Sequence, residues 1–82
     1  MEDDGQIRAR IEKLEEEREV LRRQEAAADQ APASQANRLE EIRIELDRLW
    51  DLLRQRQALR DAGQDPGQAQ ERSADTVERY WQ

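Results

Sequence analysis

The hydrophobic residues in the first third of the chain recur at alternating intervals of four and three positions. They are Ile7, Ile11, Leu14 and Leu21. Arg18 occupies the one position of this series that is not apolar. Such intervals place residues along one narrow face of an α-helix, as in a coiled-coil seam. The pattern predicts a helix over about residues 4–29, and Asp3 with Gln6 has the spacing of a capping box at its start.

A second series with the same spacing follows in the middle of the chain. It consists of Leu39, Ile42, Leu46, Leu49 and Leu53. Ser34 precedes this series and can cap the N-terminus of a helix. Gly63 can close the last turn in the left-handed conformation, and Pro66 prevents the helix from resuming. These signals predict a second helix over about residues 35–62.

The two series also predict how the helices pack. Pro32 lies between them and interrupts a helix, because its ring removes a hydrogen bond and clashes with the preceding turn. If the chain folds back there, both seams fit one antiparallel register, which pairs Ile11 with Leu53 and Leu14 with Leu49. We therefore predict an all-α fold, in which residues 1–63 form an antiparallel two-helix coiled-coil hairpin.

The remaining residues, 64–82, differ in composition from the hairpin. Residues 64–72 are polar and have the character of a flexible linker. The last residues carry an apolar cluster of Val77, Tyr80 and Trp81, with Ser73 as a candidate helix cap before it. Such a cluster favours docking, which gives a partly ordered tail. It can dock on its own hairpin, on a neighbouring copy or on another protein, and the sequence leaves these three alternatives open.

The second predicted helix carries more apolar surface than one seam uses. Leu52 and Leu59 form a second row beside the seam, and Trp50 lies at the other edge. A two-helix hairpin with a single seam buries little apolar area against its ordering entropy. We therefore expect self-association through Leu52, Leu59 and Trp50, with two hairpins forming a homodimeric four-helix bundle.

The composition excludes several chemistries. The chain has 82 residues, of which 41% are charged and 35% hydrophobic, and it has no Cys and no His. Disulfides, thiol nucleophiles, histidine bases and the usual zinc sites are therefore absent. The three glycines form no phosphate-binding loop. We predict that the protein is not an enzyme and has no catalytic, cofactor-binding or metal-binding residues.

A basic cluster suggests an alternative function. It consists of Arg48, Arg54, Arg56 and Arg60. Arginine binds phosphate well, so a nucleic-acid-associated or transcription-associated regulator is one interpretation, with Glu25 and Asp29 as an acidic hairpin tip. The net charge of −6 disfavours nucleic acid. Arginine is also abundant along the entire chain, which favours solvated helix faces over a dedicated site.

Targeting signals are not visible in the sequence. The chain opens with the acidic residues Glu2, Asp3 and Asp4, whereas a secretory signal has positive charge followed by an apolar run. No apolar stretch approaches the length of a membrane span. We expect a cytoplasmic protein that does not bind membranes.

Residues 46–56, with the sequence Leu-Asp-Arg-Leu-Trp-Asp-Leu-Leu-Arg-Gln-Arg, carry a family resemblance. Together with Gly63, Asp65-Pro66 and the closing Val77-Glu78-Arg79-Tyr80, they resemble a small uncharacterised actinobacterial family, a domain of unknown function of similar length. The resemblance covers nearly the entire chain and implies a cytoplasmic bacterial protein. It implies no catalytic or binding residues.

These observations favour a small helical protein of structural or protein–protein interaction function over the nucleic-acid alternative. We expect a dimer that also binds a protein partner of unidentified nature. The candidate partner surface consists of Asp51, Arg54, Arg56, Val77, Tyr80 and Trp81.

Overall fold

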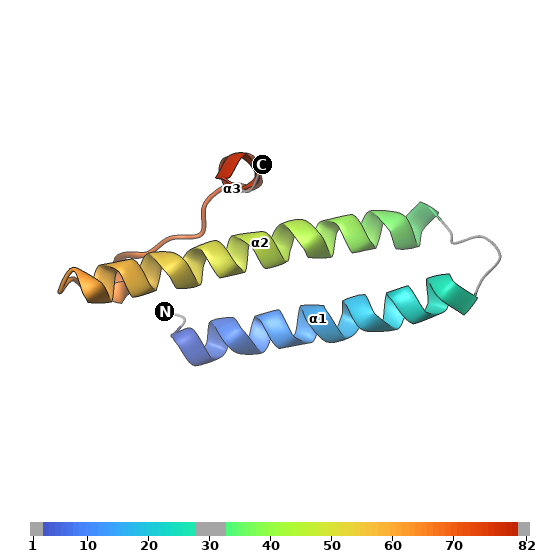
Figure 1. Cartoon of the computed structure of the whole chain (residues 1–82), viewed down its shortest axis with the longest axis horizontal. Helices are drawn as coiled ribbons and strands as arrows, with labels where there is room; N and C mark the ends of the chain where they lie inside the picture. Colours follow the sequence, from blue (N-terminus) through green and yellow to red (C-terminus); the bar gives the residue numbers. More distant parts are fainter. Residues whose placement is uncertain (1–2, 28–32, 81–82) are drawn as a thin grey trace.

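The computed structural model describes residues 3–27 and 33–80, with the side chain of Tyr80 outside the description. Helix α1 (Asp4–Ala27) and helix α2 (Ala33–Asp61) lie side by side as an antiparallel hairpin. A short 3₁₀ helix, η1 (Pro66–Gln68), and helix α3 (Ala74–Tyr80) follow. Figure 1 shows that α1 and α3 lie on opposite sides of α2. The all-α hairpin predicted from the sequence is confirmed.

The start of α1 has the capping box that the sequence predicts. The backbone N–H of Asp3 donates to Oε1 of Gln6 at 2.9 Å, and the N–H of Gln6 donates to Oδ1 of Asp3 at 2.8 Å. These two bonds satisfy N–H groups that have no partner within the helix. Helix α2 begins at Ala33, one residue before Ser34, so Ser34 lies in the first turn and does not precede it. Pro32, the predicted interruption, lies outside the described residues.

Helix α2 ends in the way that Gly63 predicts. Gly63 has φ +73°, the left-handed conformation that residues with a side chain rarely adopt. The N–H of Gln64 donates to the carbonyl of Leu59 at 2.7 Å, and the N–H of Gly63 donates to that of Arg60 at 2.9 Å. This pair of bonds is a Schellman motif. It ends α2 and turns the chain back toward the hairpin.

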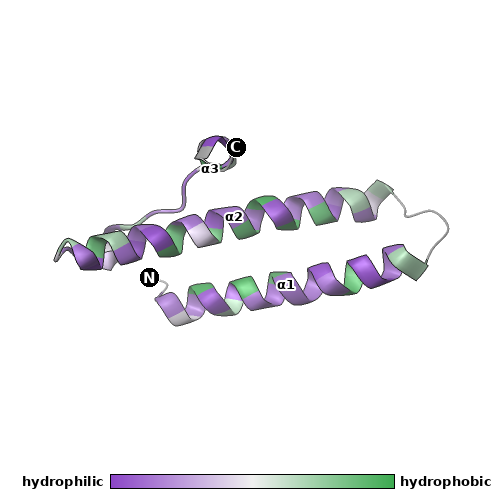
Figure 2. Ribbon diagram, viewed as in Figure 1, coloured by the Kyte–Doolittle hydropathy of each residue, from purple (hydrophilic) through white to green (hydrophobic). Residues whose placement is uncertain are grey.

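Most of the buried side chains belong to one cluster that joins α1 and α2. In α1 only the first turns contribute fully buried residues, and in α2 they come from the middle of the helix. They are Ile7, Ile11, Ile42, Leu46, Leu49, Leu52 and Leu53. Leu14 and Leu21 pack against this cluster and are partly buried. Figure 2 shows the hydrophobic residues as separate bands on two otherwise hydrophilic helices. The core is therefore a single narrow strip.

The register of the hairpin differs from the predicted one. The predicted register places Ile7 opposite Arg56, whereas Arg56 binds Asp4 at the start of α1. Glu17 binds Arg38, and Gln24 binds Gln35; both partners precede the residues that the predicted register would place opposite. A repeat of four and three matches equally well when one helix shifts by a turn, so spacing alone does not fix the register. The charges decide it, because the observed register sets Arg56 beside a carboxylate.

The C-terminal segment has a defined course, although residues 64–72 read as a flexible linker. Oδ1 of Asp65 accepts from the N–H of Gly67 at 2.9 Å and caps η1. Ser73 caps α3, since its Oγ accepts from the N–H of Thr76 at 3.3 Å. Both η1 and α3 pack on α2. The segment thus forms a third layer on the hairpin, which accounts for its order.

Candidate functional site

Trp50 is the large apolar side chain that α2 presents to solvent, with 40% of its surface exposed. It belongs to a row with intervals of four and three, which places its members on one face of the helix. The row, which we call the Trp50 face, consists of Leu39, Arg43, Asp47, Trp50 and Arg54. An exposed tryptophan between arginines is typical of protein interfaces, in which both residue types are enriched.

A groove of about 280 Å³ lies at the end of the Trp50 face nearer the hairpin turn. Ala36, Leu39 and Glu40 line it from α2, while Arg22 and Glu25 line it from α1. The groove therefore combines apolar side chains with charges of both signs. It extends the Trp50 face across the contact between the two helices.

Arg43 ties the Trp50 face to the C-terminal helix. Its guanidinium binds Glu40 at 2.7 Å and Asp47 at 3.1 Å, and it also binds Glu78 of α3. Hydrogen bonds from Arg43 hold the pKa values of Glu40 and Glu78 below the ordinary value. Burial raises the pKa of Asp47, and the adjacent Glu78 adds to that effect. Oε2 of Glu78 is buried without a hydrogen-bond partner.

The predicted Leu52–Leu59 row lies under the C-terminal segment. Leu52 retains only 7% exposure, and Leu59 is half-buried beside Gln68 and Ala69. In a single chain, Leu52 therefore belongs to the core, and the apolar row predicted for self-association is largely covered. Of the three residues predicted for that contact, Trp50 is the one with a substantially exposed side chain.

Asp51, predicted at a partner surface, is also covered. It is 8% exposed, accepts from Nε2 of Gln55 at 2.9 Å and lies 3.5 Å from Nε of Arg72. Gln55 in turn donates to the carbonyl of Gln70 at 2.7 Å. Asp51 thus anchors the returning segment to α2, which explains why a charged residue is buried there.

Arg56 is the second predicted surface residue that the fold uses internally. Its side chain is 12% exposed, although the sequence placed it on the candidate partner surface. It binds Asp4 of α1 and donates to the carbonyl of Pro66 at 3.2 Å. Arg56 therefore joins α1, α2 and the C-terminal segment at the open end of the hairpin.

The remaining predicted surface residues divide into two groups. Arg54 is exposed on the Trp50 face, whereas Val77 of α3 is fully buried. The side chain of Tyr80 and all of Trp81 lie outside the described residues. The structure thus leaves Trp50 and Arg54 as the predicted residues that share an exposed face.

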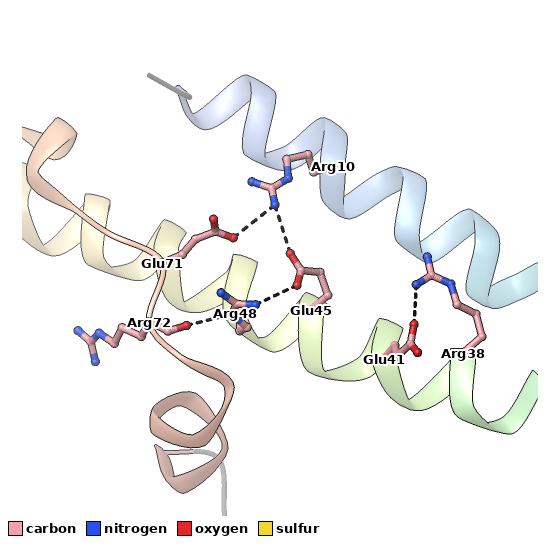
Figure 3. Close-up of polar contacts among 7 residues, drawn as sticks. All are labelled: Arg10, Arg38, Glu41, Glu45, Arg48, Glu71 and Arg72. Carbon is pink, nitrogen blue, oxygen red and sulfur yellow. Dashed lines mark hydrogen bonds and ion pairs between the residues drawn. The ribbon is translucent and has the colours of Figure 1, made fainter. Parts of the chain in front are cut away.

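Sequence reasoning missed a charged cluster that joins three segments. Figure 3 shows Arg10 of α1 between Glu45 of α2 and Glu71 of the C-terminal segment, at 3.2 and 3.3 Å. Glu45 also binds Arg48, whose Nε donates to the carbonyl of Arg72 at 2.9 Å. Arg18, the polar position in the seam of α1, binds Glu15 at 3.6 Å. Local spacing indicates the pair of Glu45 and Arg48, but not the contacts with Arg10, Glu71 and Arg72, which are distant in sequence.

The basic cluster at Arg48–Arg60 does not form a free cationic patch. Arg48 and Arg56 bind groups of the C-terminal segment, and Arg60 binds Asp4 and donates to Gln57. Arg54 also has an interaction partner. These guanidinium groups hold the fold together, so few donors are left to contact phosphates.

Within residues 3–27 and 33–80, no group of three or more acidic side chains is placed to hold a metal ion. None of the helices in these ranges is long and apolar enough to cross a membrane. The grooves of the described chain are open and lined by charged and apolar side chains.

Comparison with known proteins identifies the family. The family model described as "Protein of unknown function (DUF2630)" matches residues 3–82. The chain belongs to the DUF2630 family. This DUF2630 protein is 44% identical over 77 residues to an uncharacterised protein of Mycobacterium bovis, covering 94% of this chain and 88% of the relative. Uncharacterised proteins from two strains of Mycobacterium tuberculosis match to the same extent.

No solved structure matches this DUF2630 chain significantly. The family assignment agrees with the resemblance found in the second helix and at the end of the chain. Its relatives are mycobacterial, as the actinobacterial resemblance implies.

Proposed function

We propose that this protein is a non-enzymatic helical protein–protein interaction or structural protein that self-associates through α2. The observation that carries the proposal is the 40% exposure of Trp50 on a face whose other members are leucine, arginine and aspartate. A tryptophan held on a helix contributes large contact area at little entropic cost. In this proposal the contact lies on the Trp50 face, since Leu52 is covered within one chain.

The accessible surface and the shape of the chain support contact with a second chain. The chain exposes 5908 Å². A folded monomer of this mass has about 5,100 Å² by the usual scaling with mass. The surplus reflects an elongated shape, with extents of 53, 25 and 17 Å. An elongated protein with a narrow core gains stability by covering part of this area with a second chain.

The alternative function, a nucleic-acid-associated or transcription-associated regulator, has less support. Arg48, Arg56 and Arg60 make contacts within the chain. At the acidic hairpin tip, Glu25 is exposed, and Asp29 lies outside the described residues. Binding to duplex DNA or single-stranded RNA that weakens steeply with salt would favour this alternative. Absence of binding at low salt would exclude direct contact with these nucleic acids.

Light scattering of the full chain tests self-association. We expect the mass of a dimer for the natural sequence and the mass of a monomer for Trp50→Glu, because a charge on the contact face costs desolvation. Val20→Glu is the matched control, since Val20 is a similarly exposed apolar residue on α1, 49% accessible. We expect it to remain a dimer. A monomeric natural protein, or a Trp50→Glu variant that stays dimeric, would contradict the proposal.

A further inference from the structure

We propose that the Trp50 face binds the same face of a second copy in antiparallel orientation, with Trp50 of each copy against Arg43 of the other. This inference rests on the proposed self-association and adds to it the orientation and the contacting residues. It follows from the spacing, the charges and the adjacent groove on this face.

The spacing allows a straight helix to lie along the face. Leu39, Arg43, Asp47, Trp50 and Arg54 follow one another at intervals of four, four, three and four, which keeps them in one row over four turns. Leu46 lies beside the middle of the row and is nearly buried already. Two such rows can meet around a two-fold axis that passes between Leu46 and Asp47, as isologous contacts require.

The charges select the antiparallel orientation. In a parallel contact, each residue would meet its own copy, so that Arg43 would face Arg43 and Arg54 would face Arg54. Like charges directly opposite one another are unfavourable. In an antiparallel contact centred between Leu46 and Asp47, Arg43 meets Trp50 of the second copy instead, and Asp47 is the one charged member of the row that lies near its own copy. A guanidinium over an indole ring is a favourable cation–π contact.

The same orientation places Arg54 of the second copy at Leu39, beside the groove. Leu39 and Ala36 offer an apolar surface for the methylene stem of this arginine. Glu40 is 58% exposed and lines the groove, so its carboxylate can accept from the guanidinium. Arg43, which binds Glu40 in the single chain, keeps Asp47 and Glu78 as partners when it turns to the indole. The groove and Arg54 are therefore complementary in charge and in shape.

Two-fold symmetry counts the groove and Trp50 contacts twice. Trp50, the exposed tryptophan of the described residues, thus supplies two anchoring contacts in the dimer.

Paired cysteine variants test the orientation, because the natural chain has no cysteine. Ala36 and Gln57 lie three residues beyond Leu39 and Arg54, at opposite ends of the row, and both are exposed. Neither residue belongs to the core, and cysteine at position 36 keeps a small apolar side chain at the edge of the groove. The two ends are far apart within one helix, so a disulfide between them has to join two chains.

We expect mild oxidation to give a disulfide-linked dimer only when Ala36→Cys and Gln57→Cys chains are mixed. Each variant oxidised alone should stay uncrosslinked while remaining a dimer by light scattering. Trp50→Ala should weaken the dimer by about 30-fold, the loss expected of a central interface tryptophan.

Three outcomes would overturn the inference. They differ in whether they also contradict the proposed self-association. Crosslinking of each variant alone indicates a parallel contact. A dimer that forms no disulfide, either in the mixture or with each variant alone, uses another surface. Both results leave the proposed self-association standing, whereas a natural chain that is monomeric by light scattering removes the proposed function together with this inference.

Discussion

Arg56 of α2 binds Asp4 at the first turn of α1 while donating to the carbonyl of Pro66 in the returning segment. One side chain near the end of the second helix therefore holds both neighbours of that helix. The carboxylate that it binds lies at a helix N-terminus, where a negative charge is also favoured by the helix dipole. Beyond Leu53, the last apolar residue of the seam, this ion pair holds the open end of the hairpin together.

This contact predicts the effect of Arg56→Ala. The variant loses the ion pair, the bond to Pro66 and the packing of the methylene stem, which together should lower the free energy of unfolding by about 2 kcal/mol. Urea denaturation followed by circular dichroism measures the change. Arg8→Ala is the control, since Arg8 is exposed on α1, and it should alter stability by less than about 0.5 kcal/mol. Equal effects of the two substitutions would contradict the role of Arg56.

The same contact predicts a pH dependence. Hydrogen bonds from Arg56 and Arg60 hold the pKa of Asp4 below its ordinary value of 3.8. A carboxyl group with a lowered folded-state pKa stabilises the fold above the unfolded pKa and loses this contribution as the pH falls through the folded one. The natural protein should therefore lose stability on acidification below about pH 4.

Asp4→Asn isolates this contribution from that of other carboxylates. The amide that replaces the carboxyl group cannot ionise, so the variant should be less stable than the natural protein near neutral pH, and the difference should shrink toward about pH 2. Thermal unfolding monitored at a series of pH values follows both proteins. A constant difference across the series would show that the Asp4 charge does not contribute.

The position of the core predicts an unequal cost of truncating leucines. Leu49 is fully buried, whereas Leu21 is only partly buried and lies nearer the hairpin turn. Leu49→Ala should destabilise the protein by about 3 kcal/mol and Leu21→Ala by about 1 kcal/mol. Chemical denaturation at one fixed protein concentration compares the two variants, because any dimer adds to the measured stability. A larger cost at Leu21 would mean that the half near the turn holds the fold together.

Val77 predicts how the C-terminal segment is attached. It is fully buried in the short helix α3, and Val77→Asp would place a charge at this buried position. We expect the segment to undock and proteases to cleave it at least about 10-fold faster, which follows from a loss of about 1.4 kcal/mol or more in docking. Arg79→Ala, on the exposed side of the same helix, should leave the cleavage rate unchanged. If both variants resist protease equally, other contacts carry the docking.

Features that depend on a few neighbouring residues could be predicted from the sequence. The Asp3–Gln6 capping box and the left-handed Gly63 involve groups within one or two turns, so their residue types suffice to identify them. The two helices follow from apolar spacing for the same reason. The antiparallel hairpin also follows, because a break between two compatible seams leaves little choice of arrangement.

Features that depend on distant contacts could not be predicted in the same way. The register differs from the predicted one by one to two turns, since the repeat tolerates such shifts and only contacts between distant residues, such as Arg38 with Glu17, distinguish the alternatives. Leu52 and Asp51 read as surface residues because nothing in residues 64–72 indicates packing. The polar bonds that order this segment, such as Gln55 to Gln70, use side chains that also occur in flexible linkers.

For the candidate site, the sequence placed the self-association row at Leu52 and Leu59, on a side of α2 that is largely buried within one chain. A helical wheel gives the angle of Leu52 and Leu59 relative to the seam, but it does not tell which angle another segment of the same chain will cover. The groove beside Leu39 requires both helices and their register. It therefore appears only in the folded structure.

Gly63 sets the direction in which the chain leaves α2, and therefore which side of the helix is buried. With φ +73° at this residue, the segment after α2 returns along the helix and encloses Leu52. A side chain at this position meets open space but a strained backbone, so the obstacle to substitution is conformational rather than steric. The conformation of Gly63 thus sets which sides of α2 the C-terminal segment covers and which sides stay exposed.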